Sequence, residues 1–183
     1  MLSKESDLAI VREHIRKESN IKHMIAVGAI MGELAARFGE DAVRWELAGL
    51  LHEIDLEECS SMEDHGVIAK GILSGKVDDE IIDVIMAHNH EATGVPVDSR
   101  AKTALIASDA ASGLIMACAL VMPSKKLADV RASSLRKRFG SKDFARNVSR
   151  ERIMRCEELG LSRDDFLEIS LEGLRKVSDE LGL

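Results

Sequence analysis

The apolar residues of this chain recur every three or four positions, and no stretch alternates apolar and polar residues as a strand does. Residues 21–38 give the clearest example, and they are followed by Gly39, a residue type that commonly ends a helix. The 183 residues include only two prolines and 3% aromatic side chains, so few of them break helices or favour sheets. The pattern therefore predicts an all-α fold, organised as a helical bundle.

Capping residues and glycines divide the chain into the expected helices. Residues 88–96 are predicted to form a loop, because they contain Gly94 and Pro96. We expect a single domain over residues 1–183, with a core in 20–122 and a basic, helical extension in 123–183. The expected helices span about 6–17 (cap Ser6), 21–38 (cap Asn20), 41–55 (from Asp41), 64–73, 78–87 (cap Asp78), 99–122 (from Ser99) and 162–181 (cap Ser162).

Charge is distributed unevenly along the chain. The net charge is −7, yet residues 123–155 hold eleven Lys or Arg against three Asp or Glu. Such a basic segment is commonly a solvated surface, and it also suits an anionic substrate. It does not favour nucleic acid, because no aromatic platform for base stacking accompanies it.

Three features predict a soluble, cytoplasmic protein. The first twelve residues are charged and lack an apolar signal core. The longest uncharged run, residues 110–124, is fifteen residues long and too short for a membrane span. The odd set Cys59, Cys118 and Cys156 has no metal-type spacing and is typical of reduced thiols. We therefore expect no membrane partner, and the sequence leaves the oligomeric state open.

An imidazole and a carboxylate, His52 and Glu53, stand side by side at the end of the apolar run 48–55. Polar groups at the border of a core are costly unless something binds them. Further histidines stand near expected helix ends or inner helix edges, and facing helices of a bundle commonly build metal sites from such side chains. A single histidine in such a position is more often a core or surface residue, but their number and order favour a ligand set. They are His23, His65, His88 and His90.

His23, then residues 51–55, then residues 107–110 resemble the pattern of the HD-domain metal-dependent phosphohydrolases. That pattern is a histidine, a distant His-Asp pair and a later aspartate, all on the helices of an α-helical bundle. The likeness covers about residues 20–120. Residues 64–73 and 88–96 are similar to the histidine-led helix and to the His-His-Glu and Gly-Tyr-Pro segment of the HDIG and HD-GYP branches.

The resemblance implies one or two divalent metal ions per chain, drawn from Mn, Fe, Zn, Ni, Co or Mg. The first would be held by His23, His52, Glu53 and Asp109. Glu53 would bridge to a second ion held by His65 and His88, with His90 as the competing ligand. Glu53 and Asp109 would be the catalytic carboxylates.

Three positions depart from the family's pattern. Glu53 stands where the family has aspartate, and its extra methylene shifts the carboxylate by about 1.5 Å, one C–C bond. Asp55 either compensates in part or caps the following turn. Leu56 replaces the lysine of the HDIG and HD-GYP motif, and no tyrosine precedes Pro96. The missing tyrosine argues against cyclic-di-GMP hydrolysis.

The expected activity is hydrolysis of a phosphoester by metal-activated water, with a nucleotide or another small phosphorylated metabolite as the substrate. Two alternatives are a di-iron oxygenase on the same fold and a degenerate HD domain that binds a metal or a nucleotide. Ser108 and Ser112 are expected to be packing residues. Basic residues of the segment 123–155 are candidates for binding the substrate phosphate, and the alternative is that they are exposed charges on helix faces. The candidates are Lys125, Lys126, Arg131 and Arg150, with Lys137, Arg138 and Arg146 as further members of the segment.

Overall fold

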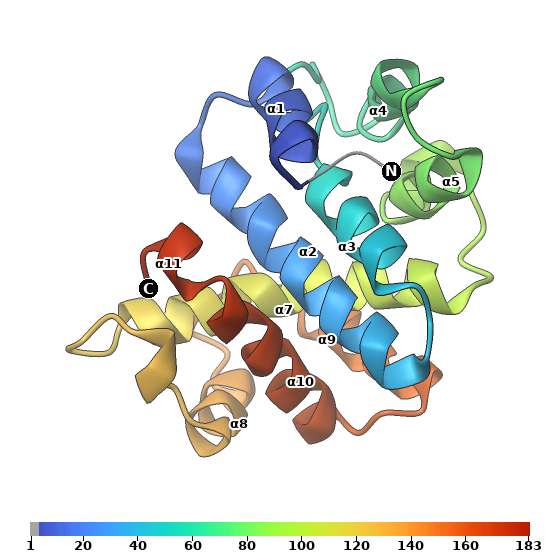
Figure 1. Cartoon of the computed structure of the whole chain (residues 1–183). Coiled ribbons are helices and arrows are strands. Elements are labelled where there is room, and N and C mark those ends of the chain that lie inside the picture. Colours follow the sequence, from blue (N-terminus) through green and yellow to red (C-terminus); the bar gives the residue numbers. More distant parts are fainter. Residues whose placement is uncertain (1–3) are drawn as a thin grey trace.

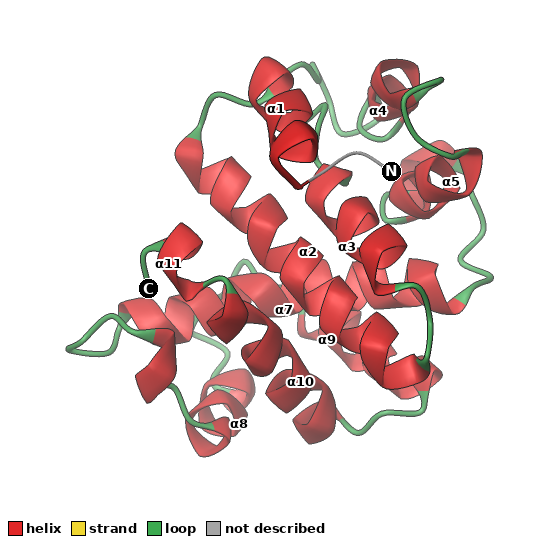
Figure 2. Cartoon of the chain, in the orientation of Figure 1, coloured by secondary structure: helices red, strands yellow, loops and turns green. Residues whose placement is uncertain are grey.

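The computed structural model describes residues 4–183, and side chains from residue 6 onwards. In this part of the chain, helices account for the regular structure and no strand occurs, so the predicted all-α fold is confirmed (Figure 2). The α-helices are α1 (Lys4–His14), α2 (Glu18–Phe38), α3 (Ala42–Leu51), α4 (Val67–Leu73), α5 (Asp79–Ala87), α6 (His90–Thr93), α7 (Arg100–Leu120), α8 (Ala132–Gly140), α9 (Arg150–Met154), α10 (Arg163–Lys176) and α11 (Ser178–Leu181); the short 3₁₀ helices are η1 (Leu127–Asp129) and η2 (Arg155–Leu159).

Helices α2 and α3 form a tight pair at the centre of the fold (Figure 1). Gly39 ends α2 in the left-handed conformation, and the Asp41 side chain caps α3 by accepting bonds from Val43 N and Arg44 N. The two backbones touch where Gly49 faces Gly28, since a Cβ on Gly49 would lie 2.7 Å from the Gly28 Cα. Only glycine permits this approach, which fixes the spacing of the two helices.

Helix α7 runs behind α2, and α10 packs against α2 on the side away from α3 (Figure 1). Gly173 of α10 lies on the backbone of Ala29, with a Cβ position 2.7 Å from the Ala29 carbonyl oxygen. Within the described residues, α7 is the one helix long and apolar enough to cross a membrane. Since 67% of its most apolar window is buried, it serves as the core helix of the bundle.

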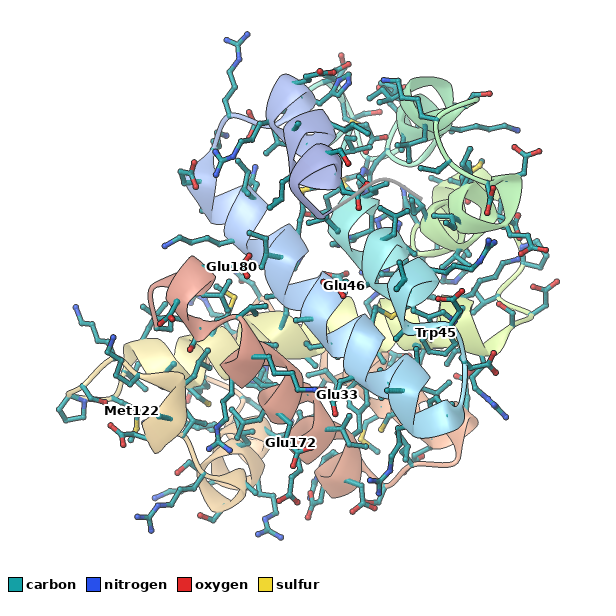
Figure 3. The ribbon with its side chains drawn as sticks, in the orientation of Figure 1. Glu33, Trp45, Glu46, Met122, Glu172 and Glu180 are labelled. Atoms are coloured by element: carbon teal, nitrogen blue, oxygen red, sulfur yellow. The ribbon has the colours of Figure 1, made fainter. Side chains whose placement is uncertain are left out.

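One continuous hydrophobic core runs from Val11 to Leu183. Phe166 of α10 is fully buried in it, beside residues of α2 and α7. The outer sides of these helices carry charge, such as Glu33 on α2 and Glu172 on α10, and Glu33 pairs with Lys176 (Figure 3). The segment after residue 122 therefore shares its core with the segment before it.

Several helix boundaries differ from the predicted ones. Ser6 already lies inside α1, and Asn20 lies inside α2, where its amide donates to Glu57 instead of capping the helix. Residues 64–66 precede α4, and the short helix α6 occupies part of the predicted loop. Val177 interrupts the last helix and divides it into α10 and α11.

Candidate metal centre

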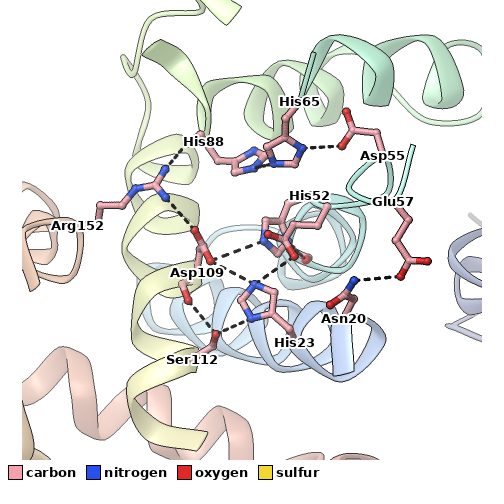
Figure 4. A network of polar contacts seen from close by, with 12 residues as sticks. Asn20, His23, His52, Asp55, Glu57, His65, His88, Asp109, Ser112 and Arg152 are labelled. Carbon is pink, nitrogen blue, oxygen red and sulfur yellow. Dashed lines mark hydrogen bonds and ion pairs between the residues drawn. The ribbon is translucent and has the colours of Figure 1, made fainter. Parts of the chain in front are cut away.

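Three helices place four side chains around one point (Figure 4). His23 projects from α2, His52 and Glu53 follow the end of α3, and Asp109 lies in the middle of α7. Their ligand atoms all lie within 4.8 Å of one another. His23 Nε2 lies 3.2 Å from Asp109 Oδ1 and 3.6 Å from Glu53 Oε2, and His52 Nε2 lies 4.0 Å from the same Asp109 oxygen. The structure thus brings together the four residues predicted for the first ion.

A second pair of histidines adjoins this group. His65, just before α4, and His88, at the end of α5, bring their Nε2 atoms to 2.8 Å. The His88 ring also lies against His52, with 5.1 Å between the ring centroids. His88 therefore connects the two groups, as expected of neighbouring metal positions.

Every histidine of the two groups has its Nδ1 atom bonded to a protein acceptor. This arrangement places the Nδ1 proton on the acceptor side and leaves the Nε2 lone pair facing inward, the orientation in which imidazole binds metals. The acceptors are Ser112 Oγ for His23 (3.1 Å), Gly49 O for His52 (2.8 Å), Asp55 Oδ1 for His65 (2.8 Å) and Ile85 O for His88.

These inward lone pairs fit a divalent cation. With their Nδ1 protons engaged elsewhere, His65 and His88 would present two acceptors to each other at 2.8 Å, so a proton or a metal ion must lie with them. Two nitrogen ligands that bind one ion at a right angle stand about 3 Å apart. His52 Nε2 is buried without a hydrogen-bond partner in the described structure. Such an orphaned polar atom is costly unless a ligand satisfies it.

Burial keeps two of the histidines neutral. It lowers the pKa of His52 to about 4 and that of His88 to about 3, and neighbouring histidines lower both values further. At neutral pH both rings are therefore unprotonated at Nε2. This is the form that coordinates a metal.

Carboxylates act in the opposite direction on the other two histidines. Burial alone would lower the pKa of His23, but Asp109 and Glu53 raise it; Asp55 likewise raises the pKa of His65 against the effect of burial. The pKa of Asp109 is lowered far below its usual range, because its contacts with His23 and the other histidines outweigh its burial. Asp109 is therefore ionised at neutral pH, and its negative charge lies where a cation would bind.

Asp55 supports the site without facing the shared point. One oxygen accepts from the His65 ring, and the other accepts from the backbone N–H groups of Gly66 and Ala69 at 2.8 Å. It therefore caps the turn that leads into α4, one of the two roles considered from the sequence. Ser112, expected to be a packing residue, also supports the site, since its hydroxyl donates to Asp109 O and accepts from His23.

His88, rather than His90, makes the contact with His65. His90 begins α6, and its Nδ1 atom is buried without a partner among the described residues. It lines a cavity of about 830 Å³ beside the histidine pair, together with His88 and Asn89.

The residues predicted to bind substrate phosphate are not among those that line the cavity beside this centre. The Arg150 guanidinium donates to six backbone carbonyls between Arg138 and Val148 and so stabilises that segment. Lys125, Lys126 and Arg131 follow the end of α7, which lies about 17 Å along the helix from Asp109 at 1.5 Å per residue. The charge count located a basic segment but carried no information about which of its residues reach the site.

The cation that does reach the centre is Arg152, on α9. Its Nη1 donates to Asp109 Oδ2 at 3.1 Å, and its Nη2 donates to the backbone carbonyl of His88 (Figure 4). Sequence reasoning counted Arg152 in the basic segment without singling it out. No local signal marks a contact between residues 43 positions apart.

Arg152 lines two cavities. One of about 220 Å³ is lined by His23, Asp109 and Arg152, and the 830 Å³ cavity is lined by His88, His90 and Arg152. The centre is therefore open to small molecules on the side where Arg152 lies.

Comparison with protein families gives one match: residues 20–112 match the HD domain. A search of the curated proteins and a search of the solved structures gave no significant match. The matched region contains His23, His52, Glu53 and Asp109, the four residues that meet at the first position. Because the match covers half of the chain, and the fold is all-α with a His and carboxylate cluster, the chain belongs to the HD-domain family, whose members are typically metal-dependent phosphohydrolases.

Proposed function

We propose that this protein is a metal-dependent phosphohydrolase that acts on a small phosphorylated molecule, a nucleotide or another phosphometabolite. The observation that carries the proposal is the set of four histidines whose Nδ1 atoms are held by protein acceptors. The Nε2 atoms of His23 and His52 face Asp109, and those of His65 and His88 face each other. Such a preorganised set of nitrogen and oxygen donors suits ions such as Mn, Fe and Zn. The family assignment supports the same reaction class.

His23, His52, Glu53 and Asp109 would hold the first ion, and His65 and His88 would hold the second. Glu53 is the glutamate that stands where the family's pattern has aspartate. Its carboxylate lies 3.6 Å from His23 Nε2, so the longer side chain still reaches the shared point. This distance supports Glu53 as a ligand of the first ion, and the resemblance assigns it the bridge to the second.

Divalent ions in such a site lower the pKa of water to about 7 and neutralise charge on a phosphoryl group. The residues of the chain orient the ligands, and burial keeps His52 and His88 in the unprotonated form that binds a metal. Asp109 contacts both the histidines and the arginine of the centre, because its Oδ1 faces His23 and its Oδ2 faces Arg152. Burial of His52 and His88 excludes water from the back of the site.

Metal analysis of protein purified without added metal, followed by assays on p-nitrophenyl phosphate and a panel of nucleotides and sugar phosphates, tests the proposal. His52→Ala is expected to lose metal and to lower kcat/KM by about 100-fold or more. His14→Ala is the matched control, because His14 pairs with Glu58 near the surface and lies outside the centre.

A metal-loaded protein that releases no phosphate from any of these compounds would contradict the proposal. Bound iron with dioxygen consumption would select an oxygenase instead. A protein that binds neither metal nor phosphoester, and that is unaffected by Glu53→Ala, would point to a degenerate HD domain.

For the location we propose the cytoplasm. The thiols of Cys59, Cys118 and Cys156 are free, and burial raises the pKa of each to about 11. Unpaired thiols of this kind are typical of a reducing compartment.

A further inference from the structure

Arg152 differs from the neighbouring arginines in how its donors are used. The Arg150 guanidinium is surrounded by backbone carbonyls, and Arg155 pairs with Glu158 at 2.9 Å. Arg152 uses two of its five N–H groups, one on Asp109 and one on the His88 carbonyl. Its side chain is 38% exposed and lines both cavities. It therefore retains donors at the open side of the centre.

The contact with Asp109 does not compete with a ligand role for that carboxylate. Oδ1 lies 3.2 Å from His23 Nε2, and Oδ2 lies 3.1 Å from Arg152. An ion at the first position would take the first oxygen while Arg152 keeps the second. Arg152 thus holds Asp109 in place and is itself held beside the position where a substrate would react.

The charges around the larger cavity limit what can lie beside Arg152. Four carboxylate side chains line this cavity, and its two basic side chains are those of Arg152 and Arg155. Arg155 is already paired with Glu158. The remaining carboxylates repel additional phosphate groups but accept hydrogen bonds from hydroxyl or amino groups. The remaining carboxylates are those of Glu91, Glu151 and Glu157.

We propose, on the basis of the proposed function, that Arg152 binds the reacting phosphoryl group of the substrate. The 830 Å³ cavity beside it receives the organic part of a phosphomonoester rather than a polyphosphate chain. Arginine suits this role, because its planar fork binds two phosphoryl oxygens at once. The residue lies outside the matched region 20–112, so this part of the site is supplied by the C-terminal segment.

Binding of inorganic phosphate to the full-length, Mn²⁺-loaded protein, measured by calorimetry, tests the first part of the proposal. Arg152→Gln is expected to raise the phosphate Kd about tenfold or more, and Arg152→Lys is expected to recover only part of the loss because it lacks the fork. Arg155→Gln removes an equal charge from the same cavity without touching Asp109 or His88, and its Kd should stay within about twofold of the wild type. Metal content is measured for every variant.

An unchanged phosphate Kd in metal-loaded Arg152→Gln overturns the assignment, as does a wild-type protein that binds no phosphate. Equal losses in the Arg152 and Arg155 variants also overturn it, because general charge would then explain the binding. If Arg152 governs phosphate binding but no phosphoester is hydrolysed, the proposed reaction fails while this assignment stands. If p-nitrophenyl phosphate is hydrolysed equally well by Arg152→Gln, the reaction stands and this assignment fails.

Competition by adenosine mono-, di- and triphosphate against bound phosphate, with free Mn²⁺ held constant, tests the substrate class. The monophosphate is expected to compete at about fivefold lower concentration than the triphosphate, because the latter places more charge against the acidic lining. The double variant Glu151→Gln/Glu157→Gln should narrow that difference. A triphosphate that competes as well as the monophosphate in the wild type overturns the assignment of the cavity.

Discussion

Replacement of Gly49 by alanine tests how the packing of α2 against α3 sets the geometry of the metal centre. The new Cβ would lie 2.7 Å from Gly28 Cα, 2.8 Å from Gly28 N and 2.9 Å from the Val27 carbonyl carbon. All three atoms belong to the backbone, so no side chain can rotate away. Because carbon atoms pack at about 3.5–4.0 Å, the two helices must separate by about 1 Å.

The expected cost follows from this separation. Overpacking of a core typically destabilises a protein by about 1–3 kcal/mol. For a domain of this size a loss of about 2 kcal/mol lowers Tm by about 4–8 °C. His23 lies on α2 and His52 follows α3, so the same shift moves two ligands apart by more than the roughly 0.2 Å that a metal site tolerates. We expect Mn²⁺ affinity to fall about tenfold or more.

Thermal unfolding in metal-free buffer and Mn²⁺ titration by calorimetry measure the two effects separately. Gly71→Ala is the matched control: Gly71 lies in α4, where an added Cβ meets nothing within 4 Å. Alanine there should raise stability by about 0.5–1 kcal/mol and leave metal binding unchanged. The reasoning is refuted if Gly49→Ala unfolds and binds Mn²⁺ as the wild type does.

Three further predictions concern residues around the core. Ser112→Ala removes the acceptor for the His23 ring, so Mn²⁺ affinity should fall about tenfold in a titration, and an unchanged affinity would show that Ser112 only packs. Asp55→Asn weakens three hydrogen bonds to a buried carboxylate and should cost about 2–3 kcal/mol at pH 7 by urea unfolding; a cost below about 0.5 kcal/mol would contradict that role. Burial lowers the pKa of Lys102, but Asp83 and Asp98 raise it by more, so that it lies above the usual 10.5. The stability that this lysine adds is therefore complete below pH 10.5 and is lost as the pH rises beyond it. The gap in urea midpoint between wild type and Lys102→Met should therefore close only above pH 10.5, and closure at neutral pH would exclude the pairing as its source.

Local patterns predicted the fold well because helix signals lie within a few residues of the helices they start. Asp41, Ser99 and Ser162 stand where helices were expected to begin, and each side chain caps its helix in the structure. Asn20 was wrong as a cap, since its amide instead binds Glu57, 37 residues away. The residues around Asn20 in the sequence therefore could not indicate that its partner is Glu57.

The candidate site likewise has residues that the sequence predicted and contacts that it could not predict. His23, His52, Glu53 and Asp109 could be assembled from spacing and resemblance, and the structure places their ligand atoms together. The supporting contacts could not be predicted, because the acceptors for the ring Nδ1 atoms include backbone carbonyls, which every residue carries. Arg152 was missed for a related reason: its role depends on how the C-terminal segment folds back over α7.

Direct contacts between helix backbones fix the position of α2 against α3 and α10. Gly49 against Gly28, and Gly173 against Ala29, leave no side-chain rotamers to switch, so the wall that carries His23 behaves as a rigid body. The opposite side of the centre is built differently, because the turn-rich residues 141–149 are held by the Arg150 guanidinium and lead into the five-residue helix α9. Arg152 is carried by that helix. If Arg152 binds the phosphoryl group as proposed, the packing of α9 against α7 sets where that group lies relative to Asp109.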